Sequence, residues 1–255
     1  MIGAIAGDVI GSIFERCSIK STQFPLFSSY SRFTDDTVLT VAIADSILRK
    51  TDYATSLKTF GQKYPNAGYG GSFFRWIYAA DSKPYNSWGN GSAMRVSPVG
   101  FAFGSIEDVL EEAKKSAKVT HNHPEGIKGA QATALAVFLG RSFKSKTIIK
   151  QEISNRFSYN LDRTLEEIRP HYGFDVSCQG SVPEAIIAFL EAKNFEDAIR
   201  NAISLGGDSD TIACIAGGIA QSYYQKIPSE IVSNVRKRLP EEFLFIMDEF
   251  NTQYG

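Results

Sequence analysis

The sequence has little of what several common classes of protein need. It contains only three cysteines, Cys17, Cys178 and Cys214, and they show no paired spacing. Neither a disulfide framework nor a cysteine zinc site is therefore expected, and a reducing, cytoplasmic setting is predicted. No apolar stretch approaches the roughly 18–20 residues that a membrane helix needs. The first residues lack a basic segment, which argues against a signal peptide.

An excess of charge of one sign is also missing. Lys and Arg total 27 while Asp and Glu total 28, so the formal net charge is −1. This balance gives no long-range attraction to nucleic acid or to an anionic membrane surface. Any anion that binds this protein must therefore be held by local geometry.

Strand periodicity is absent, whereas helical periodicity recurs along the whole chain. Helices are predicted at residues 1–16, 34–50, 57–64, 106–117, 127–143, 185–190, 195–205, 211–224 and 231–254. In the first of these helices, Gly3, Gly7 and Gly11 share one face, which allows another backbone to approach closely. The sequence thus predicts one all-α domain over residues 1–255, a compact orthogonal helical bundle.

Two helix starts carry paired carboxylates beside a threonine: Thr34, Asp35 and Asp36 at one, and Asp208, Asp210 and Thr211 at the other. One interpretation is that these residues are ordinary helix caps, because Asp and Thr are favoured at N-termini. Capping accounts for one acid per helix, whereas each start carries two. The alternative is a two-centre divalent metal site between the helix N-termini. Ligands that are all oxygen favour Mg²⁺, or Mn²⁺ as the alternative, over zinc.

Other polar features along the chain allow a functional and a purely structural interpretation. The glycines of Asn66–Ser72 precede a helical stretch and form either a phosphate cradle or a plain turn. In the loop Ser87–Arg95, Trp88 either stacks on a flat ligand or fills the core. His121 either donates to an anionic ligand or is a satisfied loop histidine. Glu15 lies seven residues after Asp8, on the same face of the predicted helix, and either forms an ion pair or reaches into a site.

Taken together, the motifs resemble those of the ADP-ribosylglycohydrolase family, all-helical enzymes with two metal ions. The matching segments occur in the family's order and span nearly the whole chain: Gly3–Glu15, Phe33–Thr37, Gly68–Ser72, Ser87–Arg95, Thr120–Ala132 and Gly206–Tyr224. The pair Thr-Asp-Asp-Thr and Gly-Gly-Asp-x-Asp-Thr is specific when both motifs are present.

The resemblance implies a role for each matching position. Thr34, Asp35 and Asp36 would hold one metal ion, Asp208 and Thr211 the other, and Asp210 would serve both. Glu15, Asp35, Asp36 and Asp210 would be the catalytic residues. The substrate, an ADP-ribosylated protein or a small ADP-ribosyl compound, would lie against Gly68, Gly70, Gly71, Ser87, Trp88, Gly89, Asn90 and His121. The implied reaction is hydrolysis of the bond between ADP-ribose and its acceptor.

Two other kinds of function compete with this expectation. A module that binds ADP-ribose without cleaving it needs no water-activating ions, so the full set of acids argues against it. A different two-metal hydrolase, such as a phosphatase acting on an ADP-ribose derivative, is the second alternative, and the balanced charge argues against a nuclease. The protein is expected to be a monomer, and the acceptor linkage and the general acid are left open.

Overall fold

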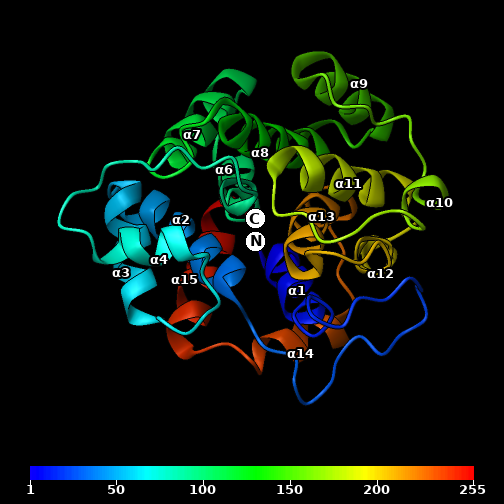
Figure 1. The fold of residues 1–255 in the computed structure, drawn as a ribbon, viewed down its shortest axis with the longest axis horizontal. Helices are drawn as coiled ribbons and strands as arrows, with labels where there is room; N and C mark the ends of the chain where they lie inside the picture. The colour runs from blue at the N-terminus through cyan, green and yellow to red at the C-terminus, as the bar shows by residue number, and fades with distance from the viewer.

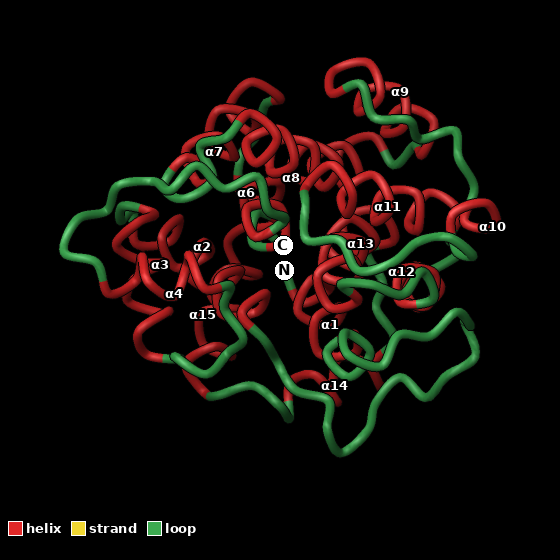
Figure 2. Tube along the Cα trace, in the orientation of Figure 1, coloured by secondary structure: helices red, strands yellow, loops and turns green.

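The structure is a computed structural model that describes residues 1–255, and it contains helices but no strand or sheet (Figure 2). The first half of the chain forms α1 (Ile2–Gly11), α2 (Asp35–Arg49), α3 (Tyr53–Lys63), α4 (Gly71–Tyr78), α5 (Gly91–Met94), α6 (Ser97–Ala102), α7 (Ile106–Lys118) and α8 (Pro124–Phe143). The second half forms α9 (Lys146–Phe157), α10 (Leu165–Ile168), α11 (Cys178–Glu191), α12 (Phe195–Ile203), α13 (Ser209–Tyr224), α14 (Ser229–Arg236) and α15 (Glu241–Tyr254). The predicted all-α fold is confirmed.

Helices α1 and α13 lie side by side at the centre of the molecule (Figure 1). The glycines of α1 explain this packing, because their missing side chains leave the space that α13 occupies. A methyl group on Gly7 would lie only 2.0 Å from the carbonyl oxygen of Ala213, and one on Gly11 would lie 2.6 Å from Cα of Asp210. The predicted close backbone approach is therefore present, and it aligns α1 with the first turn of α13.

The remaining helices surround this central pair. Helices α2, α3, α4 and α15 pack together on one side, and α8, α11 and α12 cover α13 on the other (Figure 1). All of them contribute to one continuous cluster of 71 buried hydrophobic residues, which is the arrangement of a single helical domain. No helix combines the length and the apolar composition that crossing a bilayer requires.

Two predicted helix boundaries were wrong by five residues or more. The first helix ends at Gly11 and not at residue 16, because the Ser12 hydroxyl donates to the Val9 carbonyl oxygen and a turn follows. Glu15 therefore lies in a bend beyond the helix. Helix α11 begins at Cys178, seven residues before the predicted start, since Ser177 caps it and Pro183 is accommodated inside it.

Hydrogen bonds from positively charged side chains hold the loop of residues 17–32 in place. The Lys20 ammonium donates to the carbonyl oxygen of Tyr172 at 2.6 Å and also to that of Leu205. Arg200 donates to the carbonyl oxygens of Thr22 and Phe24, at 3.0 and 2.7 Å. These contacts tie the chain that follows Glu15 to the start of the turn that precedes α13.

Candidate metal centre

The N-terminus of α2 supplies the first half of the centre. Thr34 is the N-cap, and its hydroxyl oxygen accepts from the amide of Asp36 at 3.3 Å. The amide of Asp35 donates to the carbonyl oxygen of Ala67 at 2.9 Å, which ties the glycine-rich loop to this helix start. The capping interpretation is thus correct for Thr34, yet the two acids that follow it remain free for another role.

The N-terminus of α13 supplies the second half. Gly206 and Gly207 have φ angles of +72° and +85°, which glycine adopts without strain, and this turn directs Asp208 toward α2. Asp208 occupies the N-cap position but makes no side-chain cap; its Oδ2 accepts instead from Nδ2 of Asn90 at 2.7 Å. Thr211 bridges the two helix starts, since its hydroxyl donates to Oδ2 of Asp36 at 3.2 Å.

A fifth acid, Asp8 of α1, joins the four at the starts of α2 and α13. Asp8, Asp36 and Asp210 are buried, and one carboxylate oxygen from each lies within 4.8 Å of those from the other two. Such a group can hold a metal ion. No role was predicted for Asp8, although it is the only charged residue in an otherwise apolar helix. That contrast was the available signal.

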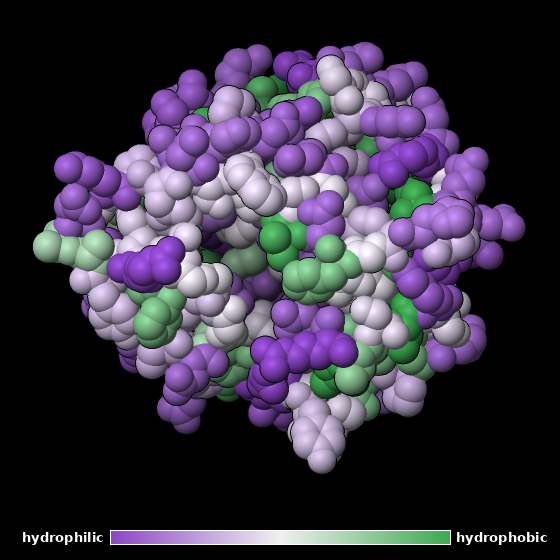
Figure 3. Space-filling model, in the orientation of Figure 1, coloured by the Kyte–Doolittle hydropathy of each residue, from purple (hydrophilic) through white to green (hydrophobic).

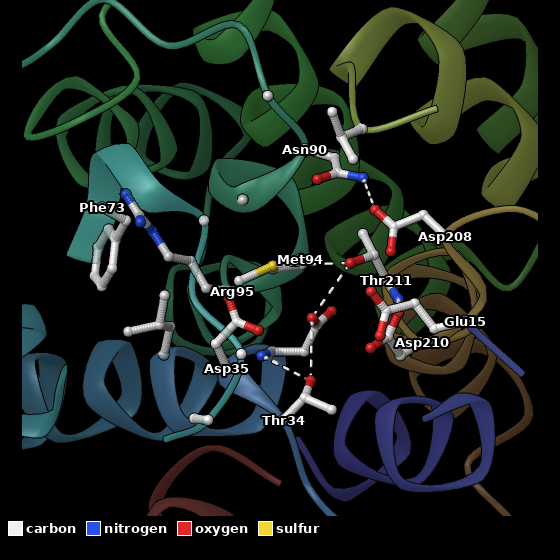
Figure 4. A pocket seen from close by; sticks show the side chains of 18 of the residues that line it. Glu15, Thr34, Asp35, Phe73, Asn90, Met94, Arg95, Asp208, Asp210 and Thr211 are labelled. Atoms are coloured by element: carbon white, nitrogen blue, oxygen red, sulfur yellow. Dashed lines mark hydrogen bonds between the residues drawn. The ribbon is translucent and has the colours of Figure 1, made fainter. Parts of the chain in front are cut away.

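The acids at the starts of α2 and α13 line a pocket of about 450 Å³, within the usual size range of small-molecule sites. Figure 3 shows a hollow near the middle of this face, and Figure 4 shows the acids of α2 and α13 turned toward one another. Almost all of the predicted site residues line this pocket: Glu15, Thr34, Asp35, Asp36, Gly68, Gly70, Gly71, Ser87, Gly89, Asn90, His121, Asp208, Asp210 and Thr211. Glu15 reaches it from the bend beyond α1.

Burial and mutual repulsion govern the ionisation of these acids. Burial, followed by the charge of Asp8, raises the pKa of Asp35 to about 8. Burial, followed by the charge of Asp210, raises the pKa of Asp36 well above its ordinary value. Burial, followed by the charge of Asp208, likewise raises the pKa of Asp210 well above its ordinary value.

None of the ion pairs in the structure includes any of these acids. Oδ1 of Asp36 is buried and has no hydrogen-bond partner. Buried carboxylates without a cation are unfavourable, so this set of oxygen donors fits a divalent cation.

Comparison with known proteins shows the family to which this chain belongs. The ADP-ribosylglycohydrolase family matches this sequence over residues 1–253. The chain belongs to that family. It is 28% identical to human ADP-ribosylhydrolase ARH3 over 304 residues, which covers 88% of this chain and 84% of that protein. It is 26% identical to the ADP-ribosylarginine hydrolase Tri1 of Pseudomonas putida over 275 residues, with 92% of this chain and 72% of Tri1 covered.

Two further relatives extend the comparison. An uncharacterized protein of Archaeoglobus fulgidus is 26% identical over 284 residues, with 96% of this chain and 92% of that protein covered. A solved structure of an ADP-ribosylglycohydrolase-related protein complex superposes with a TM-score of 0.76 at 22% identity, and it covers 100% of this chain and 96% of that one. The latter shows that the fold is shared. The chain is an enzyme of the glycohydrolase family.

The glycine-rich loop that precedes α4 borders the acids directly. Gly68 has a φ angle of +112°, and a methyl group on it would lie 3.4 Å from Oδ1 of Asp35. Helix α4 follows with Gly70 at its N-cap position and no side-chain cap, so its first amides are free to donate to a ligand. No atom lies within 4 Å of where a methyl group on Gly70 or Gly71 would be. An open cradle is consistent with the predicted phosphate contact.

The opposite wall contains a neutral histidine backed by a buried cation. Arg95 is fully buried, and its Nη2 donates to Oγ1 of Thr120 at 2.8 Å. That hydroxyl lies 2.7 Å from Nδ1 of His121. Burial and then the charge of Arg95 lower the pKa of His121 well below its ordinary value, so the imidazole is neutral. A methyl group on Gly91 would come within 3.1 Å of its Nε2.

Trp88 differs from the other predicted site residues because it is not among the residues that line the pocket. Its side chain is 48% exposed, so it does not fill the core. Its carbonyl oxygen accepts from the amide of Cys178 at 3.0 Å, which fixes the loop against the start of α11. Stacking of Trp88 on a ligand stays a prediction. His123, for which no role was predicted, caps α8, because its Nδ1 accepts from the amide of Glu125 at 3.1 Å.

Proposed function

We propose that this chain hydrolyses the glycosidic bond between ADP-ribose and an acceptor and so releases ADP-ribose. The acceptor is a protein side chain or a small compound. The observation that carries the proposal is the buried carboxylate cluster without cationic partners at the wall of a ligand-sized pocket. The reaction named for the relatives ARH3 and Tri1 agrees with it. Residues 1–255 would act as one domain and as a monomer, in the cytoplasm.

Two divalent cations would complete the centre, Mg²⁺ in the first place and Mn²⁺ as the alternative. Thr34, Asp35 and Asp36 would hold one of them, Asp208 and Thr211 the other, and Asp210 both. Two observations support this assignment: Oδ1 of Asp36 has no hydrogen-bond partner, and none of these acids forms an ion pair. When bound, such cations supply positive charge that orients ribose hydroxyls and favours ionisation of a water molecule.

The pocket around the acids would bind the rest of the ADP-ribosyl group. Gly68, Gly70 and Gly71 would donate backbone amides to the pyrophosphate, as a helix N-terminus without a side-chain cap favours. The loop Ser87–Asn90 and His121 would contact the phosphates and ribose from the other wall. This arrangement would leave the distal ribose over the carboxylates, with its acceptor directed toward Glu15.

The chain's own groups would then act on the scissile bond. Cleavage at the anomeric carbon develops positive charge on the ribose, and carboxylates beside it stabilise that charge electrostatically. A fixed ribose and a water held beside it supply the proximity that the reaction needs. The departing acceptor requires a proton, for which Glu15 and Asp210 are the candidates, since both line the pocket. Asp35 and Asp36 would fix the geometry.

The experiment that tests this proposal is chromatographic detection of free ADP-ribose. Arginine-linked and serine-linked ADP-ribosyl peptides are incubated with the protein and Mg²⁺, with the protein and a chelator, and with Asp35→Ala. Release that needs both Mg²⁺ and Asp35 is expected from at least one peptide. A peptide that binds yet stays intact would favour the reader, and release of phosphate would favour a phosphatase. If Asp35→Ala acts at the parent rate, the assignment of the metal centre is wrong.

A further inference from the structure

Asp8 lies inside the acidic cluster but makes contacts unlike those of the other acids. It sits in the middle of α1, completely buried, directly after Gly7, which packs on the α13 backbone. Proximity to Asp36 and Asp210 alone does not reveal whether it binds a cation. Its hydrogen bonds do, because they show which of its lone pairs are already used.

Four donors from α2 converge on this one carboxylate. Oδ2 accepts from the amide of Thr34 at 2.9 Å, from the amide of Thr37 at 3.1 Å and from the hydroxyl of Thr37. Oδ1 accepts from the hydroxyl of Thr34 at 2.7 Å. A carboxylate offers about four acceptor positions, roughly two on each oxygen. Because three donors already point to Oδ2, this oxygen is saturated. Asp36 differs, because its Oδ1 has no partner at all.

The Thr34 hydroxyl has one proton to donate, and its direction follows from these distances. Asp8 Oδ1 lies 2.7 Å away, whereas the other acceptor, Oδ2 of Asp36, lies at the outer limit of 3.5 Å. The proton therefore points to Asp8. The lone pairs of Thr34 Oγ1 then face the amide of Asp36 and the pocket that Thr34 lines. A cation needs a lone pair there and would be repelled by a proton.

We propose that Asp8 is a positioning residue: it holds the Thr34 hydroxyl proton away from the pocket and so makes Thr34 Oγ1 a cation ligand, without binding the cation itself. The inference rests on the proposed metal centre. Through the amides of Thr34 and Thr37, Asp8 also fixes the first turn of α2, which carries Asp35 and Asp36. One carboxylate on α1 thereby sets the direction of the donor atoms on α2.

The test measures Mn²⁺ binding to the full chain by titration calorimetry, without substrate. Two single variants, Asp8→Asn and Thr34→Val, and their combination are compared with the parent and with Thr34→Ser, which keeps the hydroxyl. Each single variant is expected to lose about 10–100-fold in affinity, the usual effect of removing a group that orients a ligand. The combination is expected to bind no more weakly than the weaker single variant, because Asp8 acts through Thr34.

A role of Asp8 as a ligand predicts a different result. If Asp8 bound the cation beside Thr34, each variant would remove a separate contact, and the losses of the two single variants would multiply in the combination. That result overturns the inference, and so does full affinity in Thr34→Val, which would show that Thr34 is not a ligand. If Asp8→Asn does not fold, Asp8→Ser replaces it in the same comparison.

The same measurements distinguish a failure of the proposed function from a failure of this inference. If the parent protein binds no Mn²⁺, the metal centre itself is wrong, and the role of Asp8 falls with it. If the parent binds Mn²⁺ and releases ADP-ribose but the losses of Asp8→Asn and Thr34→Val multiply in the combination, only the role of Asp8 is wrong.

Discussion

Replacing Asp210 with asparagine should stabilise the metal-free protein, although it should abolish activity. The change removes one charge from the buried cluster and nearly preserves the side-chain shape. One carboxylate oxygen each from Asp8, Asp36 and Asp210 lies within 4.8 Å of the other two. Two unit charges at that distance repel by about 3.5 kcal/mol at an effective dielectric constant of about 20. Asparagine retains an oxygen that can accept from the amide of Thr211, as Asp210 does at 3.0 Å.

The stabilisation should depend on pH, and the raised pKa values give its sign. Burial raises the pKa of Asp35 to about 8 and that of Asp8 to about 6, from the ordinary value of 3.8. Between pH 4 and pH 8 the folded state therefore binds more protons than the unfolded state does. The free energy of unfolding of the metal-free parent must fall as pH rises through this window. At pH 5 protonation already relieves the repulsion, so Asp210→Asn should matter most near pH 8.

Thermal unfolding followed by circular dichroism measures this effect. For a chain of this size, about 1 kcal/mol shifts Tm by roughly 2–4 °C, so Asp210→Asn should raise Tm by up to about 10 °C at pH 8 in chelator. Mg²⁺ at about a hundred times its Kd should stabilise the parent by about 2.7 kcal/mol and the variant far less. The control is Asp81→Asn, an exposed acid outside the pocket. Equal shifts at pH 5 and pH 8, or a lower Tm at pH 8, would refute the reasoning.

Two further variants test the contacts that support the site: the packing of α1 on α13 and the hydroxyl beside His121. Gly7→Ala places a methyl group 2.0 Å from the carbonyl oxygen of Ala213, so urea unfolding should show that the free energy of unfolding falls by about 1–3 kcal/mol. The control is Gly104→Ala, whose methyl group would enter open space and should change the free energy of unfolding by less than about 0.5 kcal/mol. Thr120→Val removes the hydroxyl 2.7 Å from Nδ1 of His121 and should weaken ADP-ribose binding several-fold in calorimetry. Thr120→Ser should bind like the parent, and equal affinities for Val and Ser would contradict the role of this hydroxyl.

Most of the helices were predictable because helix formation leaves a local pattern in the sequence. The helix predicted at residues 34–50 is present as α2, with Thr34 as its cap and Lys50 at its end. Errors arose where a distant contact or a turn ends the pattern. The apolar residues Ile13 and Phe14 extend the period of α1, yet the chain turns after Gly11, where α1 meets the backbone of Asp210.

The candidate site was predictable in part for the same reason. Paired acids at two helix starts are unusual in any sequence, and the structure brings Asp35, Asp36, Asp208 and Asp210 to one pocket. Asp8 was missed because its hydrogen-bond partners, Thr34 and Thr37, follow it by 26 and 29 residues. No spacing rule links residues so far apart.

The sequence by itself determined the helical class, the family and the kinds of side chain available for chemistry. These properties depend on residue type and local spacing, which can be read along the chain. Tertiary structure alone decided that α1 lies against α13, that Asp8 holds the first turn of α2, and that Asn90 holds Asp208. Such contacts join segments distant in sequence, and they exist only after packing has removed water and brought the donors and acceptors into reach.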